Sequence, residues 1–177
     1  MIPKAVLDCQ PIVASICATL KYQNNFNPLL PLAIIWQESG GNRFAWNPEP
    51  RYRWFMNVKT RKPFRKVTDD EIAAETPPPD FPCLAGDPDQ EYWAQQASWG
   101  LLQLMGSSAR ERGFNGPYLT QLVDPDINIE LGLKHLWIYA YRNGIETTER
   151  ALLRWNGGGD AQYANKVLKK LNEIESR

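Results

Sequence analysis

Glu38 is the residue whose type and surroundings point most directly to chemistry. It follows the apolar run 34–36 (Ile-Ile-Trp) and precedes Ser39 and two glycines, so we expect it at the end of an apolar helix. Apolar neighbours desolvate a carboxylate and the negative end of a helix dipole repels it, and both effects raise the pKa of a carboxyl group. A carboxylic acid that stays protonated near neutral pH suits a general acid that donates to a leaving oxygen. The alternative is a solvated, inert Glu in the last turn of a surface helix.

Two further segments combine polar side chains with glycine. Gln103 lies in the run Gly-Leu-Leu-Gln-Leu-Met-Gly over residues 100–106. A buried amide without partners costs about 1–3 kcal/mol, so Gln103 is either a satisfied core amide or a group that hydrogen-bonds a substrate. Trp155 and Asn156 precede a run of three glycines, and Tyr163 follows it. This group either lines a cleft or forms an ordinary helix end.

The elements expected to position these side chains are helical. Glycine and asparagine at the ends of the apolar patterns mark where the helices stop. The pattern contains no convincing strand and no internal repeat, which predicts a mainly α fold in a single domain over residues 1–177. The expected helices are 11–20, Pro28 (after a capping Asn27) to the glycines at 40–41, 98–112 with a break at Gly106, 126–141 ended by Asn143-Gly144, 147–155 and 160–174.

Residues 42–97 do not fit this helical pattern. They hold most of the prolines, including three in a row at 77–79. One short helix is expected over 69–74, because Thr68 and Glu71 have the spacing of a capping box. An irregular stretch of this length is uncommon in a compact domain and is usually functional or mobile.

Four segments occur in an order that resembles the lytic transglycosylase family in its soluble, goose-lysozyme-like form (glycoside hydrolase family 23), over about residues 25–171. They are Glu-Ser-Gly-Gly at 38–41, Gly-Leu-Leu-Gln at 100–103, Trp-Asn-Gly-Gly at 155–158 and Tyr-Ala-Asn-Lys-Val at 163–167. Ala-Ser-Trp-Gly at 97–100 and the pair Glu49-Pro50 are similar to the version carried by bacteriophages. The resemblance implies a lysozyme-like α domain and cleavage of the β-1,4 bond between N-acetylmuramic acid and N-acetylglucosamine in peptidoglycan.

The resemblance also implies a reaction route with one protein carboxyl. Glu38 acts as the acid and then as the base, the 2-acetamido group of the substrate stabilises the developing cation, and a 1,6-anhydro end forms. The residues that the resemblance places around the sugar or Glu38 are Ser39, Gln103, Asn156 and Tyr163. Trp155 stands where the family usually has Tyr, so we expect stacking there and the loss of a hydroxyl near the acid.

The separation of Glu38 from Gly100 is much wider than in short bacterial domains of this family, so residues 42–97 are expected to be a large insertion that forms one wall of the cleft. Glu49 in this insertion either positions a water for true hydrolysis or is a surface Glu. The insertion also carries a basic stretch interleaved with aromatic residues, which either holds an anionic wall polymer or membrane surface or is a solvated loop. Neutralising several of its cations is predicted to weaken wall binding. The cations are Arg51, Arg53, Lys59, Arg61, Lys62, Arg65 and Lys66, and the aromatic residues are Tyr52, Trp54, Phe55 and Phe64.

Composition narrows the possible partners. The net formal charge is zero, with 20 basic and 20 acidic residues, which disfavours a general electrostatic grip on nucleic acid. His135 is the single His and lies on a helix without a nearby His or Cys, so we expect a packing or surface residue and neither a metal nor another cofactor. Three cysteines do not close a disulfide framework, and we expect free, buried thiols. No apolar run reaches about 18 residues, so stable membrane insertion is not expected.

These observations favour a bacteriolytic, peptidoglycan-cleaving enzyme of a phage. It would be an endolysin released through a holin or a virion-associated lysin, and we expect a monomer. The first residues do not resemble a signal peptide, so synthesis in the host cytoplasm and action in the periplasm or wall are expected. One alternative is a hydrolytic lysozyme that uses Glu38 and Glu49. Another is a catalytically inactive wall-binding or structural protein of the virion.

Overall fold

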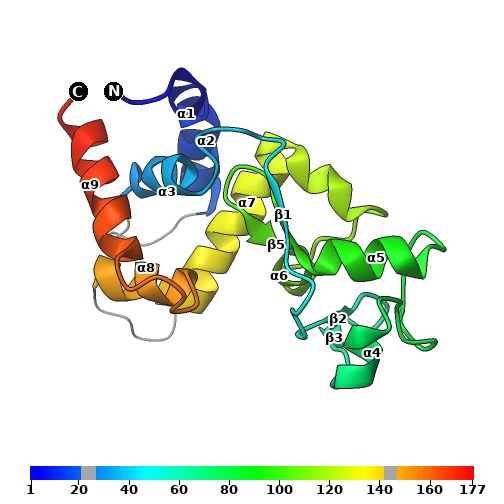
Figure 1. The fold of residues 1–177 in the computed structure, drawn as a ribbon. Coiled ribbons are helices and arrows are strands. Elements are labelled where there is room, and N and C mark those ends of the chain that lie inside the picture. Colours follow the sequence, from blue (N-terminus) through cyan, green and yellow to red (C-terminus); the bar gives the residue numbers. More distant parts are fainter. Residues whose placement is uncertain (21–26, 142–146) are drawn as a thin grey trace.

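The computed structural model describes residues 1–20, 27–141 and 147–177. Figure 1 shows the helices of the two chain ends lying together, with α7 running between them and a second group formed by residues 46–123. The helices of the first group are α1 (Lys4–Leu7), α2 (Gln10–Leu20), α3 (Leu30–Glu38), α8 (Thr148–Trp155) and α9 (Tyr163–Glu175). The helix between the groups, α7 (Pro125–His135), continues as the π-helical η2 (Leu136–Tyr141). This is the mainly α, lysozyme-like fold that the sequence predicts.

Helix α3 is the centre of the first group. Leu30 and residues 32–35 are fully buried, as expected for a helix that is apolar on all sides. The helix begins two residues later than predicted, because Asn27 caps a turn ahead of it: its Oδ1 accepts from the backbone N–H of Leu29 at 2.9 Å. The predicted end is confirmed, and the last helical residue is Glu38. The core therefore fixes the helix that carries this carboxyl.

The second group contains a small antiparallel sheet, which the sequence pattern does not indicate. Its order is β1 (Trp46–Pro48), β4 (Ala97–Trp99), β5 (Leu104–Met105), and it packs with α5 (Pro88–Gln95), α6 (Gly106–Glu111) and η1 (Leu119–Val123). The predicted helix over 98–112 is therefore wrong in its first half. Gly100 and Gln103 have left-handed backbone, with φ of +69° and +46°, which turns the chain between β4 and β5. A Cβ at Gly100 would lie 2.6 Å from the carbonyl oxygen of Leu122, so only glycine fits there.

Residues 42–97 are more regular than predicted. They contain the hairpin β2 (Met56–Asn57) and β3 (Lys62–Pro63), α4 (Asp69–Ala73) and α5, and the hairpin and α4 lie beside each other in Figure 1. The capping box of Thr68 and Glu71 is confirmed. Helix α5 was missed, although Asp87 caps it and Pro88 opens it, which are ordinary start signals.

The remaining predictions concern helix ends, cysteines and membranes. Helix α8 begins at Thr148, one residue later than predicted, because Thr147 caps it, and α9 begins at Tyr163, three residues late. The predicted stop at Asn143-Gly144 lies outside the described residues. All three cysteines are free thiols, but only Cys9 is buried, and the other two are half-buried. In the ranges that the structure describes, no helix has the length and apolar character needed to span a bilayer.

Asn128 on α7 holds the turn between β4 and β5 in place. The residue is fully buried, its Oδ1 accepts from the backbone N–H of Leu102 at 2.9 Å, and its Nδ2 donates to the carbonyl of Trp99 at 2.9 Å. These bonds join the helix to the turn that carries Gln103, so this amide helps to fix the position of that turn.

Replacing Asn128 with Leu is expected to lower the free energy of unfolding by about 2–4 kcal/mol, because a buried N–H and a buried C=O lose their partners. Urea denaturation of the variant measures this effect. The matched control is Asn172→Leu on the exposed face of α9, which should change stability little. Equal stability of the two variants would show that the Asn128 bonds do not support the turn.

Candidate active site

Two donors from different helices converge on one oxygen of Glu38. The indole Nε1 of Trp155, at the end of α8, donates to Oε1 at 3.1 Å. The hydroxyl of Tyr163, at the start of α9, donates to the same oxygen. The expectation that Trp155 would only stack is therefore wrong, because its indole N–H supplies the donor that a tyrosine hydroxyl would otherwise bring. Glu38 is half-buried and held in place, not solvated.

Burial sets the protonation of this group. Desolvation raises the pKa of Glu38, and the hydrogen bonds from Tyr163 and Trp155 offset part of that rise because they favour the carboxylate. Burial, and next the negative charge of Glu38, raises the pKa of Tyr163, so its phenol keeps its proton and remains a donor. Burial therefore favours the protonated carboxyl, and the two hydrogen bonds favour the carboxylate. This balance suits a group that must both give and take a proton.

Glu38 lines a pocket of about 380 Å³ together with several residues that the sequence singles out. Ser39 and Tyr163 are not among the lining residues; Tyr163 is buried, and its hydroxyl bonds the carboxyl of Glu38. The residues that line the pocket are Glu38, Asn47, Glu49, Ser98, Gln103, Leu104, Met105, Ser108, His135, Trp155, Asn156 and Gly157.

Ser39 fixes the turn that follows α3. Its Oγ lies 2.8 Å from the carbonyl oxygen of Leu101, to which it donates, and it accepts from the backbone N–H of Gly41 at 3.2 Å. The bond to Leu101 ties the end of α3 to the turn between β4 and β5. Ser39 therefore sets the position of Glu38 relative to the sheet.

Gln103 uses its amide on the protein itself. Its Nε2 donates to the carbonyls of Ala45 at 3.1 Å and Gly100 at 2.9 Å, and its Oε1 accepts from the hydroxyl of Ser98 at 3.1 Å. Both amide protons are therefore occupied. Of the two interpretations made from the sequence, the structure favours the satisfied amide, which joins the sheet to the loop before β1.

Asn156 closes the glycine turn after α8. With its amide oriented to satisfy both atoms, Oδ1 accepts from the backbone N–H groups of Gly159 at 3.2 Å and Asp160 at 2.6 Å. Because Asn156 also lines the pocket, the turn forms one edge of it. This turn leads into α9 and thus to Tyr163.

His135 lies in the pocket, and sequence reasoning missed this. Arg112 donates from Nε to its Nδ1 at 3.1 Å, and its ring meets Trp155 edge to face at a centroid distance of 5.6 Å. Burial, and next the charge of Arg112, lowers the pKa of His135 to about 4, so the imidazole is neutral at pH 7. The expected packing role is confirmed, but the ring supports a residue that hydrogen-bonds Glu38. No spacing in the sequence joins these residues.

Glu49 enters the same pocket from the loop after β1. Its backbone N–H donates to the carbonyl of Gln96 at 2.7 Å, which holds the loop against α5, and its side chain is exposed. The structure thus brings the two carboxyl-bearing residues that the sequence singles out to one pocket. It gives them different surroundings, half-buried for Glu38 and solvated for Glu49.

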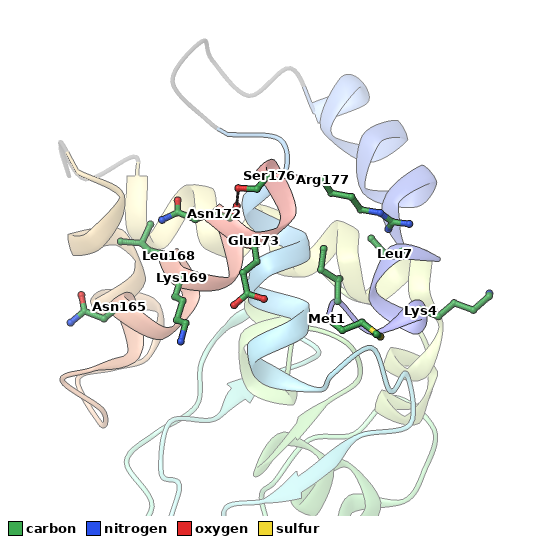
Figure 2. Close-up of a pocket in the computed structure, with 11 residues that line it drawn as sticks. Met1, Lys4, Leu7, Asn165, Leu168, Lys169, Asn172, Glu173, Ser176 and Arg177 are labelled. Atoms are coloured by element: carbon green, nitrogen blue, oxygen red, sulfur yellow. Dashed lines mark hydrogen bonds between the residues drawn. The ribbon is translucent and has the colours of Figure 1, made fainter.

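A wider surface groove of about 1130 Å³ lies between the start of the chain and α9. Figure 2 shows side chains from α1 and α9 lining it, among them Leu7, Leu168 and Glu173. None of the candidate site residues lines it, although Asn165, from the segment at 163–167, does. In the part of the chain that the structure describes, no three His, Cys, Asp or Glu side chains form a group able to hold a metal ion.

The α fold and the position of the pocket at the end of its central helix define a lysozyme-like protein. The family model named Transglycosylase SLT domain matches residues 16–175, and the chain belongs to this family. No curated protein and no solved structure gives a significant match. Membership identifies the chain as a transglycosylase domain that acts on peptidoglycan.

Proposed function

We propose that this protein cleaves the β-1,4 bond between N-acetylmuramic acid and N-acetylglucosamine with Glu38 as its only catalytic carboxyl. The observation that carries the proposal is a half-buried carboxyl in the pocket, with a pKa raised by burial and two donors on one oxygen. In the described residues no hydrogen bond reaches Oε2 of Glu38, so this oxygen is the one available for proton transfer.

The proposed reaction needs no water. Protonated Glu38 donates its proton to the bridging oxygen, the C1–O bond breaks and the N-acetylglucosamine side leaves as an alcohol. The 2-acetamido group of the muramic residue stabilises the positive charge at C1. The carboxylate of Glu38 then accepts the proton of the 6-hydroxyl while O6 bonds to C1, which closes the 1,6-anhydro ring and restores the acid. Tyr163 and Trp155 stabilise the carboxylate between these two proton transfers.

A hydrolytic lysozyme reaction is the second candidate, because Glu49 lines the same pocket as Glu38. An exposed carboxylate across a pocket can act as the base for a water, as in inverting glycosidases. The two routes differ in product mass: a 1,6-anhydro end is lighter than a hydrolysed end by one water molecule.

Digestion of purified Gram-negative peptidoglycan, with fragments identified by mass spectrometry, tests the proposal. We expect anhydro fragments from the wild type and none from Glu38→Gln. Hydrated reducing ends would favour the lysozyme route and make Glu49→Gln the next variant. Absence of fragments from the folded wild type would overturn the enzymatic proposal and favour a wall-binding virion protein.

Replacing Tyr163 with Phe is expected to raise the pKa of Glu38 further, because one hydrogen bond that favours the carboxylate is lost. The acid must be protonated to start the reaction, so activity falls as pH rises through this pKa. The alkaline limb of kcat/KM should therefore move to higher pH, while kcat at the optimum falls about tenfold. Rates measured across pH check this, with Tyr118→Phe, an exposed tyrosine outside the pocket, as control. An unmoved or acid-shifted limb would contradict the assignment.

We further propose that the protein is a phage lysin, either an endolysin or a virion-associated enzyme. Support comes from Ala-Ser-Trp-Gly at 97–100 and Glu49-Pro50, the segments that resemble the phage version. Produced in the cytoplasm of a Gram-negative cell, the protein should leave the cells intact until the inner membrane is permeabilised, after which they should lyse. Lysis without permeabilisation would contradict holin-dependent release.

A further inference from the structure

A second pocket, here called the Trp54 pocket, lies on the surface of the 42–97 segment. Its volume is about 380 Å³, and it is formed by residues 52–56, residues 63–66 and α6. Trp54 has 77% of its surface exposed. The lining residues are Tyr52, Arg53, Trp54, Phe55, Met56, Pro63, Phe64, Arg65, Lys66, Ser107, Ser108 and Glu111.

The Trp54 pocket adjoins the pocket that contains Glu38. Ser108 lines both pockets. Glu49 lines the first and Tyr52 the second, and a turn joins them in which the backbone N–H of Tyr52 donates to the carbonyl of Glu49 at 2.8 Å. A polymer held at Glu38 can therefore continue into the Trp54 pocket without leaving the surface.

The aromatic residues that line the Trp54 pocket beside Trp54 are held in place by packing. Phe55 is 3% exposed and stacks on Tyr92 at a centroid distance of 4.8 Å. Phe64 meets Phe81 edge to face at 5.1 Å. Ser107 donates to the hydroxyl of Tyr52 at 2.8 Å, which fixes this ring against α6. The exposed indole thus lines the same pocket as rings that are fixed by packing, and it offers a flat apolar face to solvent.

Three of the four charged residues that line the Trp54 pocket are already paired. Arg53 pairs with Asp69, Arg65 pairs with Glu71 and Asp80, and Glu111 pairs with Arg112. Lys66 has no ion pair in the described ranges. A strongly anionic ligand would compete with these partners, whereas a neutral ligand with apolar faces and hydroxyl groups would not.

We propose that the Trp54 pocket binds sugar rings of the same glycan strand that is cleaved at Glu38, with the indole stacked on a ring face. Continuity with the first pocket selects the same polymer, and the pairing of Arg53, Arg65 and Glu111 favours its neutral sugars over its acidic peptides. The inference rests on the proposed function for the identity of the polymer. It assigns residues 42–97 a role in gripping the strand beyond the bond that is cut.

Binding of peptide-free peptidoglycan glycan strands tests this assignment separately from cleavage. The proteins compared are Glu38→Gln alone, Glu38→Gln with Trp54→Ala, and Glu38→Gln with Trp93→Ala as control. Trp93 on α5 is 39% exposed and lines neither pocket. We expect about tenfold weaker binding with Trp54→Ala, a difference of about 1.4 kcal/mol, and no change with the control. The loss should persist in high salt, since no new ion pair is involved.

Equal affinity of the Trp54→Ala and control proteins would overturn the assignment. A loss that appears only with intact, peptide-bearing peptidoglycan and vanishes in high salt would overturn it in favour of peptide binding. Wild type that cuts no peptidoglycan would instead contradict the proposed function, and the binding comparison would still decide whether Trp54 contacts glycan. Circular dichroism of each variant excludes unfolding as the cause.

Discussion

Replacing Glu38 with Gln is expected to lower kcat on peptidoglycan by about a thousandfold or more while the fold is retained. The amide has nearly the same shape, and its oxygen can still accept from Trp155 and Tyr163. It cannot give a proton to the bridging oxygen or take one from the 6-hydroxyl. The proposed reaction uses both transfers, so both steps fail.

The Glu38→Gln substitution is also expected to affect stability. Because burial raises the pKa of Glu38 in the folded state, the ionised carboxylate is disfavoured there, and this costs stability as pH rises from the unfolded pKa towards the folded one. A neutral amide has no such cost. We therefore expect Glu38→Gln to be at least as stable as the wild type at alkaline pH.

Release of soluble fragments from dye-labelled peptidoglycan measures the loss of activity. The control is Glu130→Gln, since Glu130 lies on α7 outside the pocket and pairs with Lys134 at the surface. The control should retain full activity. A Glu38→Gln protein that keeps a tenth or more of the wild-type rate would contradict the role of Glu38.

Replacing Arg110 with Met is expected to destabilise the fold by about 3–5 kcal/mol. Arg110 and Glu91 form a two-bond ion pair at 2.9 and 2.6 Å, and their side chains are 2% and 4% exposed. Arg110 also donates to the carbonyls of Phe114 and Gly116. The substitution leaves a carboxylate without its cation in the interior, along with two unpaired carbonyls.

This ion pair is the centre of a network that joins three elements. Gln95 donates to Glu91 at 2.9 Å and exchanges two hydrogen bonds with the backbone of Met56, so α5, α6 and β2 are connected. Helix α6 also carries Ser108, which lines both pockets. Loss of the ion pair should therefore disturb the two pockets that Ser108 lines, in addition to lowering stability.

Urea denaturation of Arg110→Met and of Arg110→Met with Glu91→Leu measures the two parts of this effect. The double variant has no buried charge left, so we expect it to recover a large part of the lost stability. The surface pair of Lys4 and Asp8 provides the control, and Lys4→Met should change stability by less than about 1 kcal/mol. A double variant as unstable as the single one would show that an uncompensated charge is not the cause.

The residues around Glu38 could be predicted from the sequence where the signal is local. A nine-residue helix that is mostly apolar ends at Glu38, and Trp155 and Tyr163 flank a glycine turn, so each lies at a recognisable boundary. That these residues belong to one site was indicated only by the resemblance to a known family, because no single segment shows it. The structure adds that both donors meet the same carboxyl oxygen.

The sheet and its supports could not be predicted in the same way. Strands of two or three residues show no alternation, and the left-handed turn between β4 and β5 depends on Asn128, which lies 26 residues from Leu102. His135, at the end of α7, meets Trp155 because η2, which continues α7, packs against α8. Contacts of this kind are fixed by tertiary structure, and no local pattern marks them.

The ion pairs of the basic stretch also could not be predicted from the sequence. No acidic residue lies between Arg51 and Lys66, so the stretch looked uniformly positive. In the structure Arg53 and Arg65 pair with acids that lie later in the chain, at 69, 71 and 80. Arg65 and Glu71 pair at the surface of the protein. Even there, the hydrogen bond from Arg65 is the main reason that the pKa of Glu71 falls to about 2. Wall binding by the remaining cations stays a prediction.

The central claim is that Glu38 cuts the glycan strand without water, and digestion in water labelled with heavy oxygen tests it most directly. Peptidoglycan is cut by the wild type and by Glu49→Gln in labelled water, and the newly formed muramic ends are weighed by mass spectrometry. We predict anhydro ends without label from both proteins at similar rates. Labelled, hydrated ends from the wild type, lost in Glu49→Gln, would contradict the claim and assign the reaction to a hydrolytic pair of carboxyls.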